Sequence, residues 1–133
     1  MDNLKKVIYV VDDTDTILAQ TRELLKSQYT VRTFNSALSL IKMIENIPTP
    51  PDMLLLDIEM PDTSGTTALP KIRMIDGWQH IPVLLLTGWD TEEVLAHFFS
   101  QGVLDVVHKP IVPSVLMNRV AQYMRLIEFI GSR

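Results

Sequence analysis

VIYVVDD (residues 7–13) joins five consecutive apolar residues to a pair of aspartates. An uninterrupted apolar run of this length predicts a strand that is covered on both faces, as in a parallel sheet. Two carboxylates about 4 Å apart repel each other by roughly 1 kcal/mol in water and by roughly 4 kcal/mol at an effective dielectric constant of 20. Asp12 and Asp13 therefore need a counter-charge from elsewhere in the chain.

Four more short, largely apolar stretches follow, separated by segments with helical periodicity. They are YTVRTF (29–34), MLLLD (53–57), PVLLLT (82–87) and LDVV (104–107). We expect all five strands to be covered on both faces. The alternation predicts an α/β fold: a doubly wound, five-stranded parallel sheet with five helices. The 133 residues are expected to form a single domain, with a core at about residues 5–130.

For two of the helices, the sequence predicts where they begin or end. The last helix should run from about Ser114 to Ile130, between the start signal Pro113 and the stop signal Gly131. The third contains Pro70, which would lose a backbone hydrogen bond inside a helix. We expect the third helix to be short and to start late, near residue 69, or to be kinked in its first turn.

Polar residues stand at the carboxyl ends of the predicted strands, the edge at which open parallel sheets bind ligands. They are Asp12, Asp13, Asp57, Thr87 and Lys109. One lysine cannot neutralise three acids, and oxygen ligands without His or Cys favour Mg²⁺. A carboxylate can also attack phosphorus, and a lysine can pair with phosphate. The residues alone therefore predict a magnesium-dependent phosphoryl site in which Asp57 is the nucleophile.

The same residues also have simpler interpretations. Asp13 or Asp15 could cap the first helix, Thr87 could be a turn residue, and Lys109 could be an ordinary surface lysine. Because five such residues stand at the ends of the right strands, we favour the phosphoryl site over these separate explanations.

Taken together, four motifs resemble the receiver domain of two-component response regulators. They are the acid pair at 12–13, LLLDIEMPDTSG (54–65), LLLTG (84–88) and VVHKP (106–110), and the resemblance extends over about residues 5–130. It implies a flavodoxin-like fold with strand order 2-1-3-4-5, an order that the periodicity alone does not give. It also implies a place in a His–Asp phosphorelay.

The resemblance assigns a role to each polar position. It implies that Asp57 accepts the phosphoryl group, and that Asp13, Asp57 and the backbone carbonyl of Glu59 bind Mg²⁺ directly. It further implies that Asp12 acts largely through water. Thr87 is then expected to hydrogen-bond the phosphoryl group. Lys109 is expected to pair with it and to precede a cis peptide bond.

One position departs from the receiver pattern. Receiver domains usually carry Tyr or Phe three residues before the lysine, and this chain has Val106. A valine cannot swing a ring inward when the domain is phosphorylated. We therefore hypothesise that signalling relies on the loop after Thr87, which contains Gly88 and Trp89.

Charge and composition narrow the expected partners. The net charge of −4 and the absence of a basic cluster argue against direct binding of nucleic acid. The chain has neither an apolar run of about 20 residues nor a signal-peptide pattern, so we expect a cytoplasmic protein without membrane contact. The resemblance implies a sensor histidine kinase or a histidine phosphotransfer protein as phosphodonor, and a downstream output protein or domain. Leu126 and Phe129 lie off the core stripe of the last helix. They indicate either contact with a second copy or a following domain, or simply a partly exposed helix end.

Two other functions stay open at this point. A phosphatase of the haloacid dehalogenase type also uses a strand-end aspartate with Mg²⁺, Thr and Lys. It would need a second acid two residues after the nucleophile and a Gly-Thr beyond it, and DIEMPD (57–62) offers Glu59 but no such pair. A degenerate receiver could act only as a scaffold, but the acids at 12, 13 and 57 are intact. We expect a receiver, which is not an enzyme beyond its own phosphorylation and dephosphorylation.

Overall fold

The computed structural model describes residues 5–44, 46, 49–59, 65–88 and 91–131. Its centre is one sheet of five parallel strands in the order β2-β1-β3-β4-β5. The strands are β1 (Val7–Val11), β2 (Thr30–Phe34), β3 (Met53–Asp57), β4 (Val83–Thr87) and β5 (Asp105–His108). Both the parallel sheet and the order implied by the receiver resemblance are confirmed.

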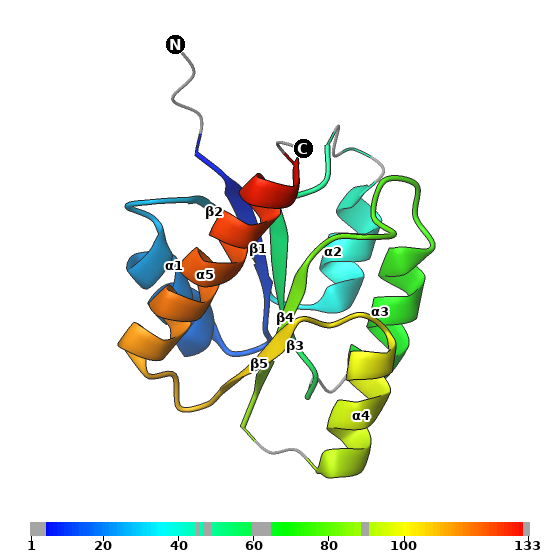
Figure 1. Ribbon diagram of the computed structural model, residues 1–133. Coiled ribbons are helices and arrows are strands. Elements are labelled where there is room, and N and C mark those ends of the chain that lie inside the picture. Colours follow the sequence, from blue (N-terminus) through cyan, green and yellow to red (C-terminus); the bar gives the residue numbers. More distant parts are fainter. Residues whose placement is uncertain (1–4, 45, 47–48, 60–64, 89–90, 132–133) are drawn as a thin grey trace.

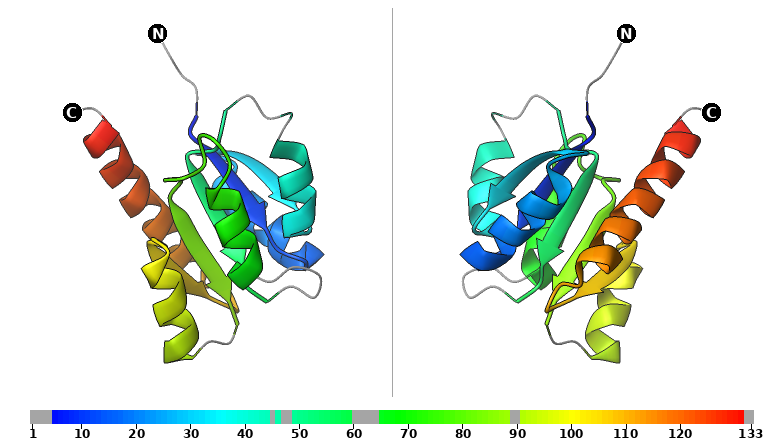
Figure 2. Two further views of the ribbon diagram at one scale, coloured as in Figure 1. Left: turned by 90° about the vertical axis from the view of Figure 1, so that its right-hand side faces the viewer. Right: turned by 90° about the vertical axis from the view of Figure 1, so that its left-hand side faces the viewer.

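Five helices cover the two faces of this sheet. They are α1 (Asp15–Leu25), α2 (Ala37–Ile44), α3 (Gly65–Arg73), α4 (Glu92–Ser100) and α5 (Pro113–Gly131). Helices α1 and α5 lie on one face, and α2, α3 and α4 lie on the other (Figure 1). The views in Figure 2 show the sheet as the middle of three layers.

Alternate residues of the inner strands belong to two hydrophobic cores, one on each face of the sheet. In β1, Ile8 and Val10 join the core beneath α1 and α5, whereas Tyr9 and Val11 join the core beneath α2, α3 and α4. Every residue of β3 and β4 is buried. The prediction that these runs are covered on both faces is therefore confirmed, and it explains why they do not alternate with polar residues.

The second strand differs from the prediction. The residues of β2 alternate between exposed and half-buried positions up to the buried Phe34, because β2 is an edge strand. Arg32 is exposed, and its guanidinium carbon lies 5.7 Å from the ring centroid of Tyr9 and 5.5 Å from that of Phe34. These cation–π contacts hold the Arg32 side chain against the edge of the core.

One of the two alternatives predicted for the third helix, a late start near residue 69, is wrong. α3 begins at Gly65 rather than near Leu69, and Pro70 lies inside it. Ala68, Leu69 and Ile72 are buried against the sheet, and this packing offsets the one hydrogen bond that Pro70 cannot donate. The helix is nevertheless short, as expected, at 9 residues.

The last helix follows its prediction closely. α5 begins at Pro113 and ends at Gly131, and Leu116, Val120 and Met124 form its buried stripe. None of the helices in the described part of the chain is long and apolar enough to cross a membrane.

Candidate functional site

The carboxyl edge of the sheet brings the predicted polar residues together. Asp12 directly follows β1, Asp57 and Thr87 are the last residues of β3 and β4, and Lys109 directly follows β5. The strand registers place Asp57 opposite Leu86 and Thr87 opposite His108, so the strand ends are level. Parallel pairing of short strands is thus what gathers residues that are far apart in the chain.

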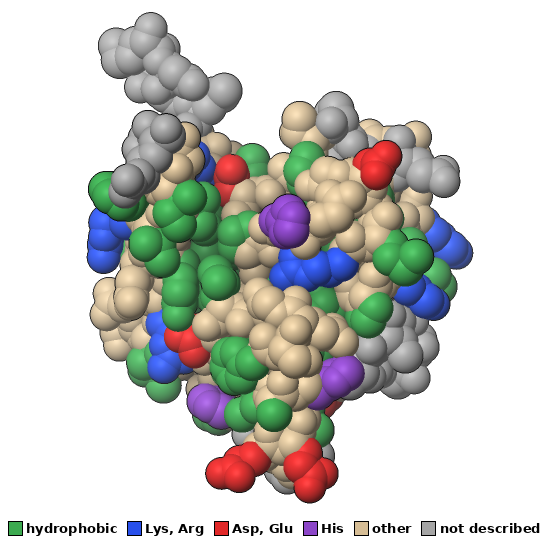
Figure 3. Space-filling view, turned by 45° about the vertical axis from the view of Figure 1, so that its right-hand side comes forward, with side chains coloured by type: hydrophobic (Ala, Val, Ile, Leu, Met, Phe, Trp, Pro, Cys, Tyr) green, Lys and Arg blue, Asp and Glu red, His purple; other side chains and the backbone are tan. Residues whose placement is uncertain are grey.

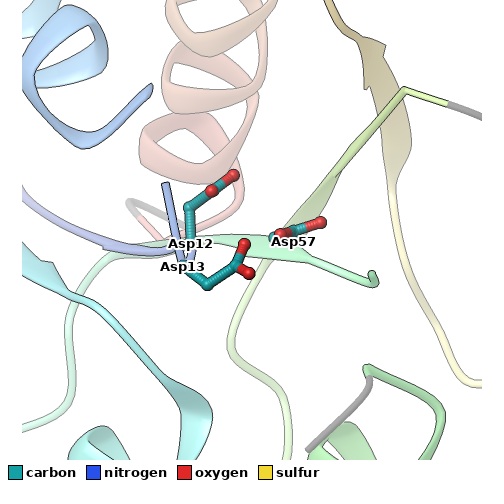
Figure 4. A group of neighbouring side chains, drawn as sticks. All are labelled: Asp12, Asp13 and Asp57. Atoms are coloured by element: carbon teal, nitrogen blue, oxygen red, sulfur yellow. The ribbon is translucent and has the colours of Figure 1, made fainter. Parts of the chain in front are cut away.

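Three carboxylates form a cluster at this edge. Each of Asp12, Asp13 and Asp57 contributes one oxygen to a group in which all the oxygens lie within 4.8 Å of one another (Figure 4). Asp12 and Asp57 are fully buried, whereas Asp13 is exposed to solvent. The cluster therefore has two buried members and one at its mouth.

Backbone amides orient the two buried acids. Oδ1 of Asp12 accepts a hydrogen bond from Thr14 N at 2.8 Å, and Oδ1 of Asp57 accepts one from Glu59 N at 2.9 Å. Thr14 is the N-cap residue of α1, and its side chain makes no capping hydrogen bond. Neither Asp13 nor Asp15 holds the N-cap position, so the capping interpretation of these acids is not supported.

Lys109 is the cation of the site. Its Nζ lies 2.7 Å from Oδ2 of Asp12 and 3.5 Å from Oδ1 of Asp57. Its N–H donates to the carbonyl of Thr87 at 2.8 Å, and the peptide bond to Pro110 is cis, as the receiver resemblance implied. The lysine is therefore tied to the site through both its backbone and its side chain.

The electrostatics of the cluster favour an added cation. Burial raises the pKa of Asp57 to about 6, although the amide of Glu59 and the charge of Lys109 act against the shift. Burial acts to lower the pKa of Lys109, but the hydrogen bond and charge of Asp12, together with Asp57, outweigh it and leave the pKa above its ordinary value. Three carboxylates facing one ammonium leave the site negative.

One buried oxygen of the cluster has neither a hydrogen bond nor an ion pair among the described residues. Oδ2 of Asp57 makes no hydrogen bond to any described residue. A buried carboxylate oxygen without a donor is costly unless water or a cation binds it. This atom, the exposed Asp13 and the oxygen-only donor set fit a hard divalent cation with open positions.

The side chain of Glu59 makes a contact that the sequence did not predict. Its Oε1 accepts hydrogen bonds from the Thr87 hydroxyl at 3.2 Å and from Gly88 N at 3.1 Å. The resemblance gave the backbone carbonyl of Glu59 a metal-binding role and named no hydrogen-bond donor for its side chain. No local sequence signal reveals this side-chain contact, because it depends on how the ends of β3 and β4 lie side by side.

The position that departs from the receiver pattern is part of the core. Val106 is 5% exposed and packs in the cluster beneath α2, α3 and α4. Its backbone carbonyl accepts a hydrogen bond from Arg119 of α5. Trp89, which we predicted to take part in signalling, lies outside the described residues, as do Met60 and Pro61 of the loop after Asp57.

A second surface lies away from this edge. Leu126, Phe129 and Ile130 of α5 are 50%, 58% and 62% exposed. Hydrophobic side chains gather on one side of the face drawn in Figure 3. Leu126 and Ile130 line a groove of about 570 Å³ that Leu104, Tyr123 and Arg73 also border. The prediction that Leu126 and Phe129 stand off the core stripe is confirmed.

Comparisons with known proteins agree with the geometry. The family model described as "Response regulator receiver domain" matches residues 8–121. The CAI-1 autoinducer sensor kinase/phosphatase CqsS of Vibrio cholerae is 36% identical over 88% of this chain, and the regulatory protein VanR of Enterococcus faecium is 35% identical over 93%. This chain spans 17% of the length of the first protein and 52% of the second.

A solved structure that resembles this chain over nearly its whole length is the CheY-like receiver domain protein from Methanospirillum hungatei. It is 26% identical, covers 96% of this chain and 99% of its own, and superposes with a TM-score of 0.85. The likeness therefore extends over nearly the whole of both chains.

Proposed function

This chain belongs to the family of response regulator receiver domains, and from that premise we propose that Asp57 is the residue that accepts the phosphoryl group. The observation that carries the proposal is the convergence of Asp12, Asp13 and Asp57 with Lys109 at one edge of the sheet. Asp57 is the central acid, with the ammonium of Lys109 on one side and the hydroxyl of Thr87 on the neighbouring strand. We propose that residues 1–133 form one receiver domain, with its core at about residues 5–130.

Mg²⁺ is the proposed cofactor. Asp13, Asp57 and the backbone carbonyl of Glu59 would hold it directly, and Asp12 would act largely through water. When bound, the ion would supply positive charge for the phosphoryl oxygens. The free Oδ2 of Asp57 and the net negative charge of the cluster support this assignment.

The proposed reaction is an in-line transfer. A carboxylate oxygen of Asp57 forms a bond to phosphorus while the bond from phosphorus to the donor's histidine nitrogen breaks, and that nitrogen keeps the electron pair. Lys109 pairs with the phosphoryl oxygens as a point charge, and the Thr87 hydroxyl donates a hydrogen bond to one of them. Dephosphorylation is the attack of water on the same phosphorus.

The phosphodonor is proposed to be a sensor histidine kinase or a histidine phosphotransfer protein, and the output a downstream protein or domain. The exposed apolar end of α5 is a candidate contact for that output or for a homodimer. The net charge of −4 argues against direct binding of nucleic acid, and we propose a cytoplasmic location without membrane contact.

A receiver labels itself and then stops, whereas a phosphatase turns over. Incubation with labelled acetyl phosphate and Mg²⁺ should therefore label the protein up to one phosphate per chain. The label should be absent from Asp57→Asn and from protein treated with a chelator. Asp52→Asn is not a suitable control, because Asp52 accepts a hydrogen bond from Val7 N; the exposed Asp76→Asn is, and it should take label like the parent.

Three results would overturn the proposal. Undiminished labelling of Asp57→Asn would show that Asp57 is not the residue that accepts the phosphoryl group. Continuous hydrolysis of p-nitrophenyl phosphate would instead favour a phosphatase of the haloacid dehalogenase type. A chain that takes no label with the parent acids intact would be a scaffold.

A further inference from the structure

The carboxylate of Glu59 binds two donors at the end of β4. A single oxygen, Oε1, accepts from the Thr87 hydroxyl at 3.2 Å and from the Gly88 amide at 3.1 Å. Glu59 lies two residues beyond Asp57 on the neighbouring strand end, so its side chain reaches across the mouth of the proposed phosphoryl site. An anionic oxygen already occupies these donors in the unphosphorylated protein.

A phosphoryl oxygen would need the same donors. It too is an anionic acceptor, and it is bound best by hydroxyl and amide groups fixed in place before it arrives. Thr87 has one hydroxyl proton and Gly88 has one amide proton. Two anionic oxygens sharing these protons would repel each other and would each lose hydrogen-bond strength.

We propose that the Glu59 carboxylate is a built-in competitor of the phosphoryl group: it takes the place of a phosphoryl oxygen on Thr87 and Gly88 and must leave when Asp57 is phosphorylated. This inference rests on the proposed function above. It assigns to Glu59 a regulatory role that is separate from the role of its backbone carbonyl.

The surroundings of Glu59 allow such an exchange. The residue is exposed, so its carboxylate can turn into solvent without leaving a buried charge behind. Its backbone is held separately, because Glu59 N donates to Oδ1 of Asp57. The side chain can therefore depart while the strand end keeps its position.

Three substitutions separate occupation of the donors from simple charge repulsion. Glu59→Ala removes both the charge and the acceptor. Glu59→Gln removes the charge but keeps an acceptor oxygen at the same reach. Glu59→Asp keeps the charge but is one methylene shorter, so it cannot reach both donors. All three keep the backbone carbonyl at position 59.

The test measures the affinity of the parent and the three variants for beryllofluoride, a phosphoryl mimic, at saturating Mg²⁺ by ¹⁵N–¹H spectroscopy. We expect Glu59→Ala and Glu59→Asp to bind roughly tenfold more tightly than the parent, since each frees two charge-assisted hydrogen bonds. The affinity of Glu59→Gln should lie between that of the parent and that of these two variants. Without metal or beryllofluoride, the Gly88 amide proton should shift upfield in the Ala and Asp variants, which lack its anionic acceptor.

Each other outcome overturns the inference. If Glu59→Asp binds like the parent while Ala and Gln both bind tightly, charge repulsion alone is at work. If all four proteins bind equally and the Gly88 amide does not move, Glu59 does not compete. In both cases the parent still binds beryllofluoride and the proposed function stands. If the parent neither binds beryllofluoride nor takes label from acetyl phosphate, both the proposed function and this inference are wrong.

Discussion

The ammonium of Lys109 lies 2.7 Å from Oδ2 of Asp12, whose side chain is fully buried. Before any phosphate arrives, the lysine is therefore chiefly the counter-ion of Asp12. This arrangement explains how a folded chain tolerates a buried acid next to a second acid. It also means that the lysine must share its charge when a phosphoryl group binds.

Removing Lys109 should destabilise the metal-free protein. Lys109→Met leaves a buried carboxylate without its partner, so we expect the free energy of unfolding in EDTA to fall by about 3 kcal/mol. Mg²⁺ should restore part of this loss by supplying positive charge. Urea unfolding with and without Mg²⁺ measures both effects. Lys42→Met, at an exposed site of α2, is the matched control and should change stability little. An equally small effect of Lys109→Met would contradict the role of the lysine as counter-ion.

Mg²⁺ should stabilise the parent protein through the acid cluster. At a concentration 100 times its dissociation constant, a ligand of the folded state adds about 2.7 kcal/mol to the free energy of unfolding. Asp13→Asn should be more stable than the parent in EDTA by about 1 kcal/mol, because it relieves repulsion. It should also lose most of the response to Mg²⁺. Thermal unfolding across a Mg²⁺ titration tests this, with Asp76→Asn as an exposed acid outside the cluster. A full Mg²⁺ response in Asp13→Asn would place the ion elsewhere.

The stability of the metal-free protein should depend on pH through Asp57. Burial raises the pKa of this carboxyl from 3.8 to about 6. Between these values the folded protein keeps a proton that the unfolded chain has released, so stability falls as the pH rises from about 4 to 6 and then levels off. Asp57→Asn has no such proton, so its free energy of unfolding should not fall in this window. Its free energy of unfolding relative to that of the parent should therefore rise by up to about 3 kcal/mol between pH 4 and 6. Urea unfolding in EDTA at several pH values provides the measurement, and parallel profiles for the two proteins would refute the expectation.

The strand ends were predictable because two local signals coincide there. An unbroken apolar run indicates a strand buried on both faces, and the first charged residue after it marks the carboxyl end. Asp12, Asp57 and Lys109 were all located in this way, and the structure brings them together. The order of the strands was not accessible from periodicity, because it is decided by long-range pairing. It came from the receiver resemblance.

The features that were missed depend on tertiary packing. The proline rule placed the start of α3 too late, since it does not count the buried contacts of Leu69 and Ile72 on either side of Pro70. The contact between Glu59 and Thr87 joins two strand ends 28 residues apart. Nothing in the neighbourhood of either residue in the chain specifies such a contact.

Trp89 should report phosphorylation through its fluorescence, because the buried Val106 stands where receiver domains usually have a movable ring. Val106 is 5% exposed and has no ring to move, so we expect phosphorylation to be sensed by the loop after Thr87. Trp78, the second tryptophan, is 2% exposed and lies 6.1 Å from Tyr9 between ring centroids. In a Trp78→Phe background, the fluorescence of Trp89 should change when beryllofluoride and Mg²⁺ are added. Asp57→Asn in the same background is the control and should show no change. If the spectrum of the Trp78→Phe protein stays constant while beryllofluoride is shown to bind, the loop after Thr87 does not carry the signal.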